Sequence, residues 1–349
     1  MRQRLRIAVA GAGLIGRRHI DLILKDPSCQ LTAVIDPAPG TAEVASRTGV
    51  PLYASLSDLF AREKPDGIIV ATPNSLHVEH GLACIAAGVP ALIEKPLADS
   101  LEAGERLCEA AERAGVTLLT GHHRQHSAIM TKAVDIVRSG RLGRLVAVVG
   151  TAMFCKPDAY FDAAPWRRQA GGGPILINMI HEIGNLRALC GEITEVQALS
   201  SNAVRGFAVE DTAAVNLRFA NGVLGTFMMS DAAASARSWE QTSREDKSYA
   251  TYPDEDCYVV AGTDGSLAIP TMRLRTFANK AARSWHNPLD SEVVAIDETD
   301  PLRRQLENFC AVIRGEAEPV VTARDGLQNL GVIEAIKQSL ACGGVVPIG

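Results

Sequence analysis

Two short motifs near the start of the chain combine residue types that can hold a dinucleotide and polarise an oxygen atom. Gly11, Gly13 and Gly16 form a Gly-x-Gly-x-x-Gly loop, and Lys95 stands directly before a proline. Glycines at this spacing allow a tight turn and a close approach of the backbone to a pyrophosphate. A lysine ammonium can bind a substrate oxygen, and with a lowered pKa it can also help to move a proton. The motifs together predict a nucleotide site with a reactive cation beside it.

The segments around the glycine loop are typical of a dinucleotide-binding βαβ unit. Apolar residues 7–10 precede the loop, a helix-like segment follows it, and Asp36 ends the next apolar run, residues 31–35. Asp36 can accept hydrogen bonds from ribose hydroxyls, whereas a 2′-phosphate would meet its negative charge. Because no basic residue is adjacent to Asp36, the sequence favours NAD over NADP.

Two later loops are expected at the same edge of the sheet, because ligands bind beyond the carboxyl ends of parallel strands. Residues 72–77 follow the apolar run 67–71, and Lys95 follows the run 91–93. Glu94 can orient Lys95 or support its loop. His77 either contacts the cofactor or simply begins the following helix. The predicted cofactor-binding residues are Gly11, Gly13, Leu14, Ile15, Gly16, Asp36, Thr72, Pro73, Asn74, His77, Glu94 and Lys95.

A third cluster lies on a predicted helix that begins after three glycines. Asn178, His181 and Asn185 stand at positions i, i+3 and i+7, so they share one face of an α-helix. The other positions are mostly Ile, Leu and Met, which indicates a buried helix with one polar stripe. A histidine is neutral near pH 7 and can act as a general base. His181 is therefore a candidate catalytic residue, the alternative being a core histidine.

Further polar residues are candidates for the rim of the same crevice. The run 122–126 follows a predicted strand, and its charge suits a hydroxylated or anionic substrate. Histidines at 122, 123 and 126 have no nearby acidic partner, so no metal site is predicted. Asp231 and residues 239–240 are rim candidates that could equally be loop residues. The predicted substrate-binding residues are Asn178, Asn185, His123, Arg124, Trp166 and Arg167.

The pattern of elements predicts an α/β protein with two domains, residues 1–125 and 126–349. In the first domain strands and helices alternate, which is typical of a doubly wound parallel sheet. In the second, longer strands follow one another, with Asn221-Gly222 as a hairpin turn, which predicts a largely antiparallel sheet. Residues 231–256 form a long polar loop, and the C-terminal helix is expected to pack back on the first domain.

These expectations can be given as residue ranges. Strands are expected at 7–10, 31–35, 67–71, 91–93, 117–120, 145–151, 196–203, 212–219, 222–230, 257–260, 266–269 and 291–296. Helices are expected at 13–24, 42–47, 56–61, 77–87, 100–114, 127–139, 175–189, 301–313 and 323–341.

Composition excludes several classes of protein. The 349 residues are 47% hydrophobic and 21% charged with a net charge of −5, so no nucleic-acid or anionic-membrane partner is expected. No apolar run reaches the ~18 residues of a membrane span, and no signal peptide is evident. The eight cysteines lack zinc spacing and are expected to be buried thiols. The chain is therefore predicted to be a cytoplasmic protein.

The motifs in this order resemble the Gfo/Idh/MocA family, named after glucose–fructose oxidoreductase, inositol dehydrogenase and rhizopine catabolism. The match includes the glycine loop, Ala-Thr-Pro-Asn at 71–74, the Glu-Lys-Pro motif at 94–96 and the glycine-led helix with His181. The resemblance implies an N-terminal Rossmann domain and a C-terminal α/β domain whose open sheet makes homodimer or homotetramer contacts. It also implies a nicotinamide cofactor and a sugar or polyol substrate. By analogy, Lys95 polarises the reacting oxygen and His181 acts as acid and base.

The chain departs from this resemblance next to His181. Many relatives carry an aspartate four residues before the histidine and an acid three residues after it, where this chain has Ile177 and Gly184. Either Lys95 and His181 suffice, or Glu182 or an acid of the 231–256 loop contributes.

The function expected from the residues and the resemblance is NAD-dependent oxidation of a secondary alcohol of a sugar, polyol or related cyclic hydroxy compound. One alternative is a cis-dihydrodiol dehydrogenase in which Arg124, Arg167 and Arg168 bind an aromatic carboxylate. The other is a non-catalytic NAD-binding regulator.

Overall fold

The computed structural model describes residues 3–349, which form two compact units. The first unit contains the chain up to His126 together with Asp300–Leu330, and the second contains Ser127–Thr299 and Gly331–Gly349. The expected second domain, residues 126–349, is therefore not one continuous unit, because residues 300–330 belong to the first. The boundary falls inside the last helix, α11 (Ala323–Cys342).

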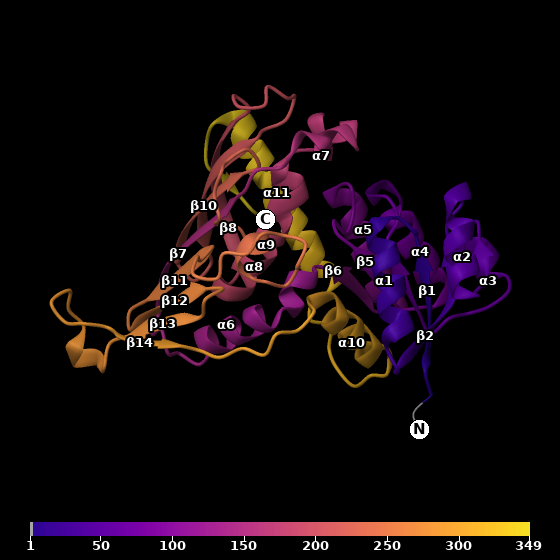
Figure 1. Cartoon of the computed structure of the whole chain (residues 1–349), viewed down its shortest axis with the longest axis horizontal. Coiled ribbons are helices and arrows are strands. Elements are labelled where there is room, and N and C mark those ends of the chain that lie inside the picture. Colours follow the sequence, from indigo (N-terminus) through magenta and orange to yellow (C-terminus); the bar gives the residue numbers. More distant parts are fainter. Residues whose placement is uncertain (1–2) are drawn as a thin grey trace. The chain divides into compact units, whose positions relative to one another are not determined.

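A six-stranded parallel sheet forms the centre of the first unit (Figure 1), as the sequence predicts. Its order, β3-β2-β1-β4-β5-β6, reverses direction between β1 and β4, which is where ligands bind in this type of sheet. The strands are β1 Leu5–Ala10, β2 Cys29–Ile35, β3 Leu52–Tyr53, β4 Gly67–Val70, β5 Ala91–Glu94 and β6 Leu118–Gly121. Only β3 was not predicted, because two residues carry no readable pattern.

Helices cover both faces of this sheet. Along β1, Ile7 and Val9 belong to one apolar cluster while Ala8 and Ala10 belong to another, since successive side chains point to opposite faces. Buried strands of this kind read as continuous apolar runs. The helices are α1 Leu14–Lys25, α2 Ala42–Thr48, α3 Leu56–Phe60, α4 His77–Ala87, α5 Leu101–Ala114 and α10 Pro301–Ile313.

The second unit is built on a nine-stranded sheet in the order β14-β13-β12-β11-β7-β10-β9-β8-β15. It is mostly antiparallel, as predicted, but β7 and β10 run parallel. The strands are β7 Leu145–Met153, β8 Ile193–Ser201, β9 Thr212–Phe219, β10 Leu224–Ser230, β11 Tyr258–Gly262, β12 Gly265–Ile269, β13 Arg273–Thr276, β14 Asp290–Val293 and β15 Val346–Pro347. Gly222 adopts the left-handed φ of +87° that the hairpin between β9 and β10 requires.

One face of this sheet is packed and the other is open. The apolar core joins the inward strand residues to helix residues such as Ile129, Ile183 and Ile333. Val149, Leu224 and Met228 on the other face are 38–53% exposed. The helices are α6 Ala128–Arg138, α7 Asp158–Asp162, α8 Ile180–Cys190, α9 Trp239–Thr242 and the second part of α11.

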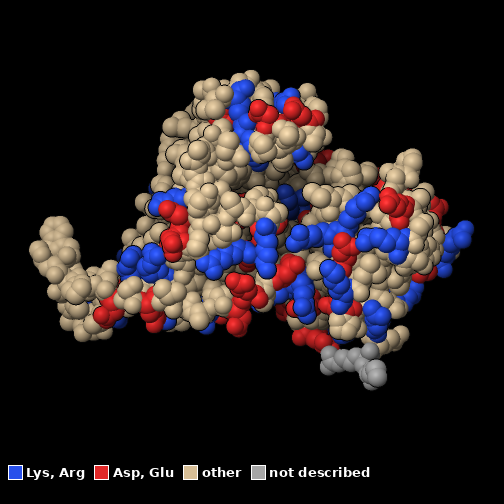
Figure 2. Space-filling model, in the orientation of Figure 1, with Lys and Arg blue, Asp and Glu red and all other residues tan. Residues whose placement is uncertain are grey.

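Two further features concern the molecule's surface and its helices. Basic and acidic side chains alternate over the face drawn in Figure 2, without a continuous patch of one sign on that face. Among residues 3–349, no helix combines the length and the apolar character needed to cross a bilayer.

Candidate active site

The glycine loop of the first unit is shaped by close backbone contacts. Gly11 has a φ of +91°, and a Cβ atom there would lie 2.4 Å from the carbonyl oxygen of Ala71. A Cβ on Gly16 would lie 1.9 Å from the carbonyl oxygen of Gly11. Gly13, by contrast, has open space around it and begins α1 without a side-chain cap. The first N–H groups of α1 are thus available to an anion, as a dinucleotide pyrophosphate requires.

Asp36 and the first residues of α1 complete this cradle. Asp36 follows β2, and its two carboxylate oxygens accept hydrogen bonds from the backbone N–H groups of Ala12 and Ala38, both at 2.8 Å. The carboxylate therefore lies beside the glycine loop, where a ribose would lie if the pyrophosphate is bound at α1. Leu14 is 93% exposed although it is apolar, and Ile15 is half-buried. The residues present fit a nicotinamide dinucleotide.

Hydrogen bonds made by the His77 side chain hold the loop that follows β4. The side chain of His77 is buried, and its Nδ1 and Nε2 atoms lie 2.7 Å and 2.9 Å from the carbonyl oxygens of Pro96 and Thr72. Both ring nitrogens are therefore used within the protein, and the cofactor contact expected of His77 stays a prediction. Thr72 is half-buried, and Pro73 and Asn74 are exposed and open to a ligand.

Lys95 stands at the carboxyl end of β5, next to a buried acid. The Glu94 carboxylate lies 2.8 Å from Nε2 of His19 and accepts a hydrogen bond from the backbone N–H of Lys95 at 3.3 Å. Burial acts to raise the pKa of Glu94, but the hydrogen bond and charge of His19, with Lys95 and His123, outweigh it and lower the pKa. Glu94 thus supports the lysine loop, as one of the expectations for it had it, and its contact with the cofactor stays a prediction. The Lys95–Pro96 peptide bond is cis.

The histidine-rich segment after β6 is largely buried. Arg124 and His126 are 5% and 4% exposed, and His123 is half-buried. Burial, with the charge of Arg124, lowers the pKa of His123 to about 4. The charges of Glu94, Lys95 and His19 also act on the pKa of His123. His123 is thus neutral near pH 7.

In the second unit the glycine-led helix begins with a π-helical turn. This turn covers Ile175–Met179, and α8 follows from Ile180. Its i→i+5 hydrogen bonds change the register, so the α-helical face predicted for Asn178 and His181 does not apply across it. His181 is 8% exposed on the first turn of α8, and Asn178 is half-buried.

Asn185 lies in the core of the second unit and not at a polar surface. It is fully buried, and its amide donates a hydrogen bond to the Tyr258 hydroxyl at 3.2 Å. The Tyr258 hydroxyl in turn donates to the Glu182 carboxylate. The amide oxygen of Asn185 is buried without a hydrogen-bond partner among the described residues, and the substrate contact expected of Asn185 stays a prediction. Glu182 is likewise used inside the core.

The parallel pair β7–β10 brings together side chains that the sequence did not associate. Lys156 and Asp231 follow these strands, and the backbone N–H of Lys156 donates to the carbonyl oxygen of Asp231 at 2.8 Å. The Lys156 ammonium is 3.4 Å from the Asp231 carboxylate and donates to Oδ1 of Asn178 at 2.7 Å. Lys156 was missed, although a Lys-Pro pair at a strand's carboxyl end repeats the pattern of Lys95.

Trp166 and Arg167 lie on a short turn of the second unit beside the same cluster. Trp166 is 53% exposed, and the Arg167 guanidinium lies 3.8 Å from the centre of the Tyr160 ring. The Lys156 ammonium lies 4.9 Å from the centre of that ring. Asn178, Lys156 and Arg167 are therefore brought into one neighbourhood.

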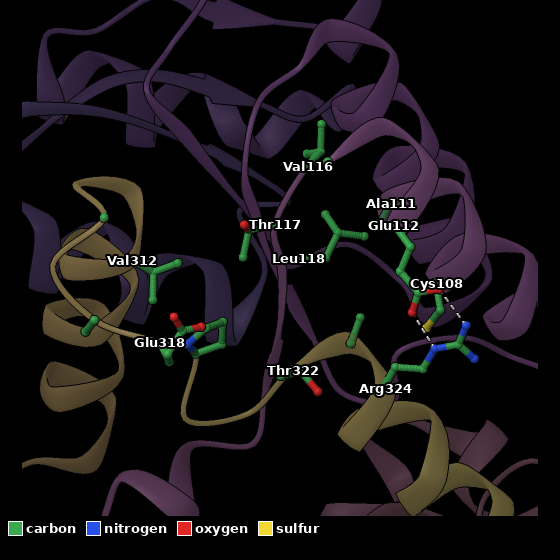
Figure 3. A pocket seen from close by; sticks show the side chains of 15 residues that line it. Cys108, Ala111, Glu112, Val116, Thr117, Leu118, Val312, Glu318, Thr322 and Arg324 are labelled. Carbon is green, nitrogen blue, oxygen red and sulfur yellow. Dashed lines mark hydrogen bonds and ion pairs between the residues drawn. The ribbon is translucent and has the colours of Figure 1, made fainter.

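A cavity of 590 Å³ in the first unit lies elsewhere. It is lined by the end of α5, the start of β6 and the segment joining α10 to α11, with Arg324 paired to Glu112 at 2.7 Å (Figure 3). Because Thr117 and Leu118 lie at the amino end of β6, this cavity is at the edge of the sheet opposite Lys95. It is not part of the candidate active site. In the described part of the chain, no three His, Cys, Asp or Glu side chains are placed to hold a metal ion.

The glycine loop, the uncapped α1 and Asp36 define a dinucleotide-binding protein, and comparison with known proteins identifies its family. A family model described as "Oxidoreductase family, NAD-binding Rossmann fold" matches residues 5–122, and the "GFO/IDH/MocA C-terminal domain" matches residues 130–268. The chain belongs to the Gfo/Idh/MocA family and is an oxidoreductase.

Individual relatives are named for sugar and polyol chemistry. The chain is 28% identical to 1,5-anhydro-D-fructose reductase of Ensifer adhaerens, with 97% of each chain covered. It is 31% identical to inositol 2-dehydrogenase of Rhodococcus erythropolis, with 60% of each covered. It also resembles the WlbA dehydrogenase of Bordetella pertussis in complex with NADH and UDP-GlcNAcA, with 25% identity, 99% of each chain covered and a TM-score of 0.78.

Proposed function

We propose that this protein is an NAD-dependent dehydrogenase that oxidises a secondary alcohol of a sugar, polyol or related cyclic hydroxy compound to a ketone. The observation that carries the proposal is the position of Lys95, which ends a strand at the ligand-binding edge of the sheet, with the buried Glu94–His19 pair behind it. The names of the relatives support the substrate class.

In the proposed reaction, the alcohol loses a hydride from carbon and a proton from oxygen, and NAD⁺ becomes NADH. When bound, the nicotinamide ring supplies the hydride acceptor. Lys95 binds the reacting oxygen and stabilises the negative charge that develops there as the proton leaves. His181 takes that proton as general base, a role that a histidine imidazole can fill near neutral pH.

The proposed cofactor is NAD and not NADP. Asp36 presents a carboxylate beside the glycine loop, and Pro37, Ala38 and Pro39 follow it without a basic side chain. A 2′-phosphate bound there would face the carboxylate without a compensating cation, which disfavours NADP.

We also infer that a second copy of the chain covers the open face of the nine-stranded sheet. Val149 on β7 pairs with Val259 on β11, and its partner on β10 is Thr226, which stands between the exposed Leu224 and Met228. Exposed apolar surface of this kind is typical of interfaces.

The first test is the turnover of Lys95→Ala. The purified protein and the variant are assayed for NADH formation with inositols, aldoses and sugar acids, each with NAD and with NADP. We expect NAD-dependent turnover in the parent and a loss of roughly 10²-fold to 10³-fold in the variant, as for other oxyanion-stabilising groups. The dissociation constant for NAD should stay nearly unchanged.

Lys25→Ala, which removes an exposed lysine from the last turn of α1, serves as the matched control and should keep full turnover. Retention of parent-level turnover by Lys95→Ala would refute the catalytic role of this lysine. Turnover with NADP equal to that with NAD would refute the role of Asp36.

A further inference from the structure

The hydrogen bond between Lys156 and Asn178 determines which way the amide of Asn178 points. A lysine ammonium has donors and no acceptor, so the amide oxygen of Asn178 must face it, as the 2.7 Å contact shows. The two N–H groups of the amide then point elsewhere, and they make no hydrogen bond within residues 3–349. Asn178 therefore offers donors, and not an acceptor, to any ligand beside it.

The Asp231 carboxylate next to Lys156 is already paired with two cations. One oxygen of Asp231 lies 3.4 Å from the Lys156 ammonium, and the other accepts a hydrogen bond from Nε of Arg205 at 2.9 Å. Asp231 is 2% exposed and shared by these two cations. The charge of Glu240 also acts on the Lys156 ammonium. Asp231 thus balances buried charge and does not serve as an acceptor for a ligand hydroxyl.

Arg167 adds a second cation to the same neighbourhood. Its guanidinium and the Lys156 ammonium lie 3.8 Å and 4.9 Å from the centre of the Tyr160 ring. Nη1 of Arg167 donates to the Tyr160 carbonyl oxygen at 2.5 Å, whereas its buried Nε makes no hydrogen bond within the described residues. Both cations thus lie against the same ring, the charge of Arg167 acts on the Lys156 ammonium, and a bound anion would offset this repulsion.

We propose that Lys156, Arg167 and Asn178 form a subsite for a carboxylate group of the substrate, so that the enzyme prefers sugar acids to neutral sugars. An ionised carboxylate only accepts hydrogen bonds and matches a set of groups that only donate. A hydroxymethyl group in its place would bring a donor with no acceptor to meet it, and a buried unpaired donor is costly. This inference rests on the proposed dehydrogenase function.

Matched substrate pairs test the inference directly. NADH formation is compared for D-glucuronate against D-glucose and for D-galacturonate against D-galactose, in the parent, in Arg167→Met and in Lys156→Met. We expect kcat/KM in the parent to favour the acid by roughly tenfold to hundredfold, the range for hydrogen bonds to charged groups. Either substitution should remove most of that preference through KM. Arg237→Met is the matched control, since Arg237 is an exposed arginine of the same unit that pairs with Glu255.

A binding measurement separates this inference from the proposed function. The shift in melting temperature of the NAD-loaded protein is measured with D-galactonate and with galactitol, which differ at the carboxylate. A larger shift with the acid, lost in Arg167→Met, supports the subsite even if no substrate turns over. Equal shifts, or equal kcat/KM for acid and neutral sugar, overturn the inference while leaving the dehydrogenase function intact.

An absence of turnover on every substrate counts against the proposed function alone. If Lys156→Met does not fold, Arg167→Met, which alters a half-buried side chain, decides the matter.

Discussion

At the residue scale, this protein buries ionisable groups close to the chemistry it is proposed to perform. In the first unit the buried Glu94 pairs with His19 and accepts a hydrogen bond from the backbone of Lys95, and in the second Lys156 and Asp231 are similarly buried. Buried charge is tolerated when it is paired and hydrogen-bonded. Buried ionisable groups that cluster in this way are typical of functional sites.

The buried histidines predict an acid-sensitive first unit. Burial, with the charges of His123 and Arg304, lowers the pKa of His126 to about 3, against about 6.5 in an unfolded chain. Above pH 6.5 the His126 side chain is neutral in both the folded and the unfolded chain, so its burial costs none of the free energy of unfolding. As the pH falls from 6.5, His126 binds a proton in the unfolded chain but not in the folded chain. The free energy of unfolding therefore decreases until the pH nears 3.

Urea unfolding at pH 7 and pH 5 measures this effect. His126 should contribute a loss of about 2 kcal/mol in the free energy of unfolding at pH 5, with a smaller loss from the half-buried His123. In His126→Asn the difference between the two pH values should shrink by that amount. An unchanged difference would show that His126 already binds a proton in the folded state at pH 5.

At the scale of elements, the glycine loop shows how a strand and a helix are joined around a ligand. Gly16 is needed because α1 begins against the carbonyl oxygen of Gly11, whereas Gly13 faces open space. One glycine therefore serves the packing of the protein, and the other is available to serve the cofactor.

Alanine substitutions should separate these two roles. Gly16→Ala places a Cβ atom 1.9 Å from a backbone oxygen, so the backbone must shift. We expect the melting temperature without cofactor to fall by about 5 °C, from an overpacking cost of about 2 kcal/mol. Gly13→Ala should keep the parent melting temperature and lose affinity for NAD. Equal melting temperatures for the two variants would contradict this division.

At the scale of the whole molecule, the nine-stranded sheet leaves an apolar face exposed. The exposed fractions of Val149, Leu224 and Met228 are 53%, 53% and 38%, and Val149 pairs with Thr226, which stands between Leu224 and Met228 on β10. A sheet covered by helices on one face buries its other face only through association. Self-association is thus the proposed use of this face.

Charge on this face should abolish assembly. In the double variant Val149→Arg/Met228→Arg, both new side chains point away from the core, so the second unit should fold with a normal circular dichroism spectrum. Sedimentation velocity should show the parent as a dimer or tetramer and the double variant as a monomer, because buried unpaired arginines are costly. Leu24→Arg, at an exposed apolar position on α1, is the matched control and should assemble as the parent does. A monomeric parent would refute the interface.

The sequence by itself determined the features that depend on local order along the chain. Gly11 and Gly16 lie in the loop between the first strand and the helix of one strand–helix–strand unit, and Asp36 follows its second strand. The spacing of that unit already requires a parallel sheet with its ligand edge beside Lys95. Alternation of apolar runs was enough to predict nearly every strand of the first unit. The resemblance added the family, which the comparisons confirm.

Only the tertiary structure decided which distant groups meet. His77 and Asn185 have residue types suited to a ligand, but the backbone carbonyls and Tyr258 that bind them come from elsewhere in the chain. Lys156 and Asp231 are 75 residues apart and adjoin because β7 and β10 pair in parallel, a choice that alternation within each strand cannot reveal. Strand order and a π-helical turn depend on long-range packing, and so does the donor-only cluster around Tyr160.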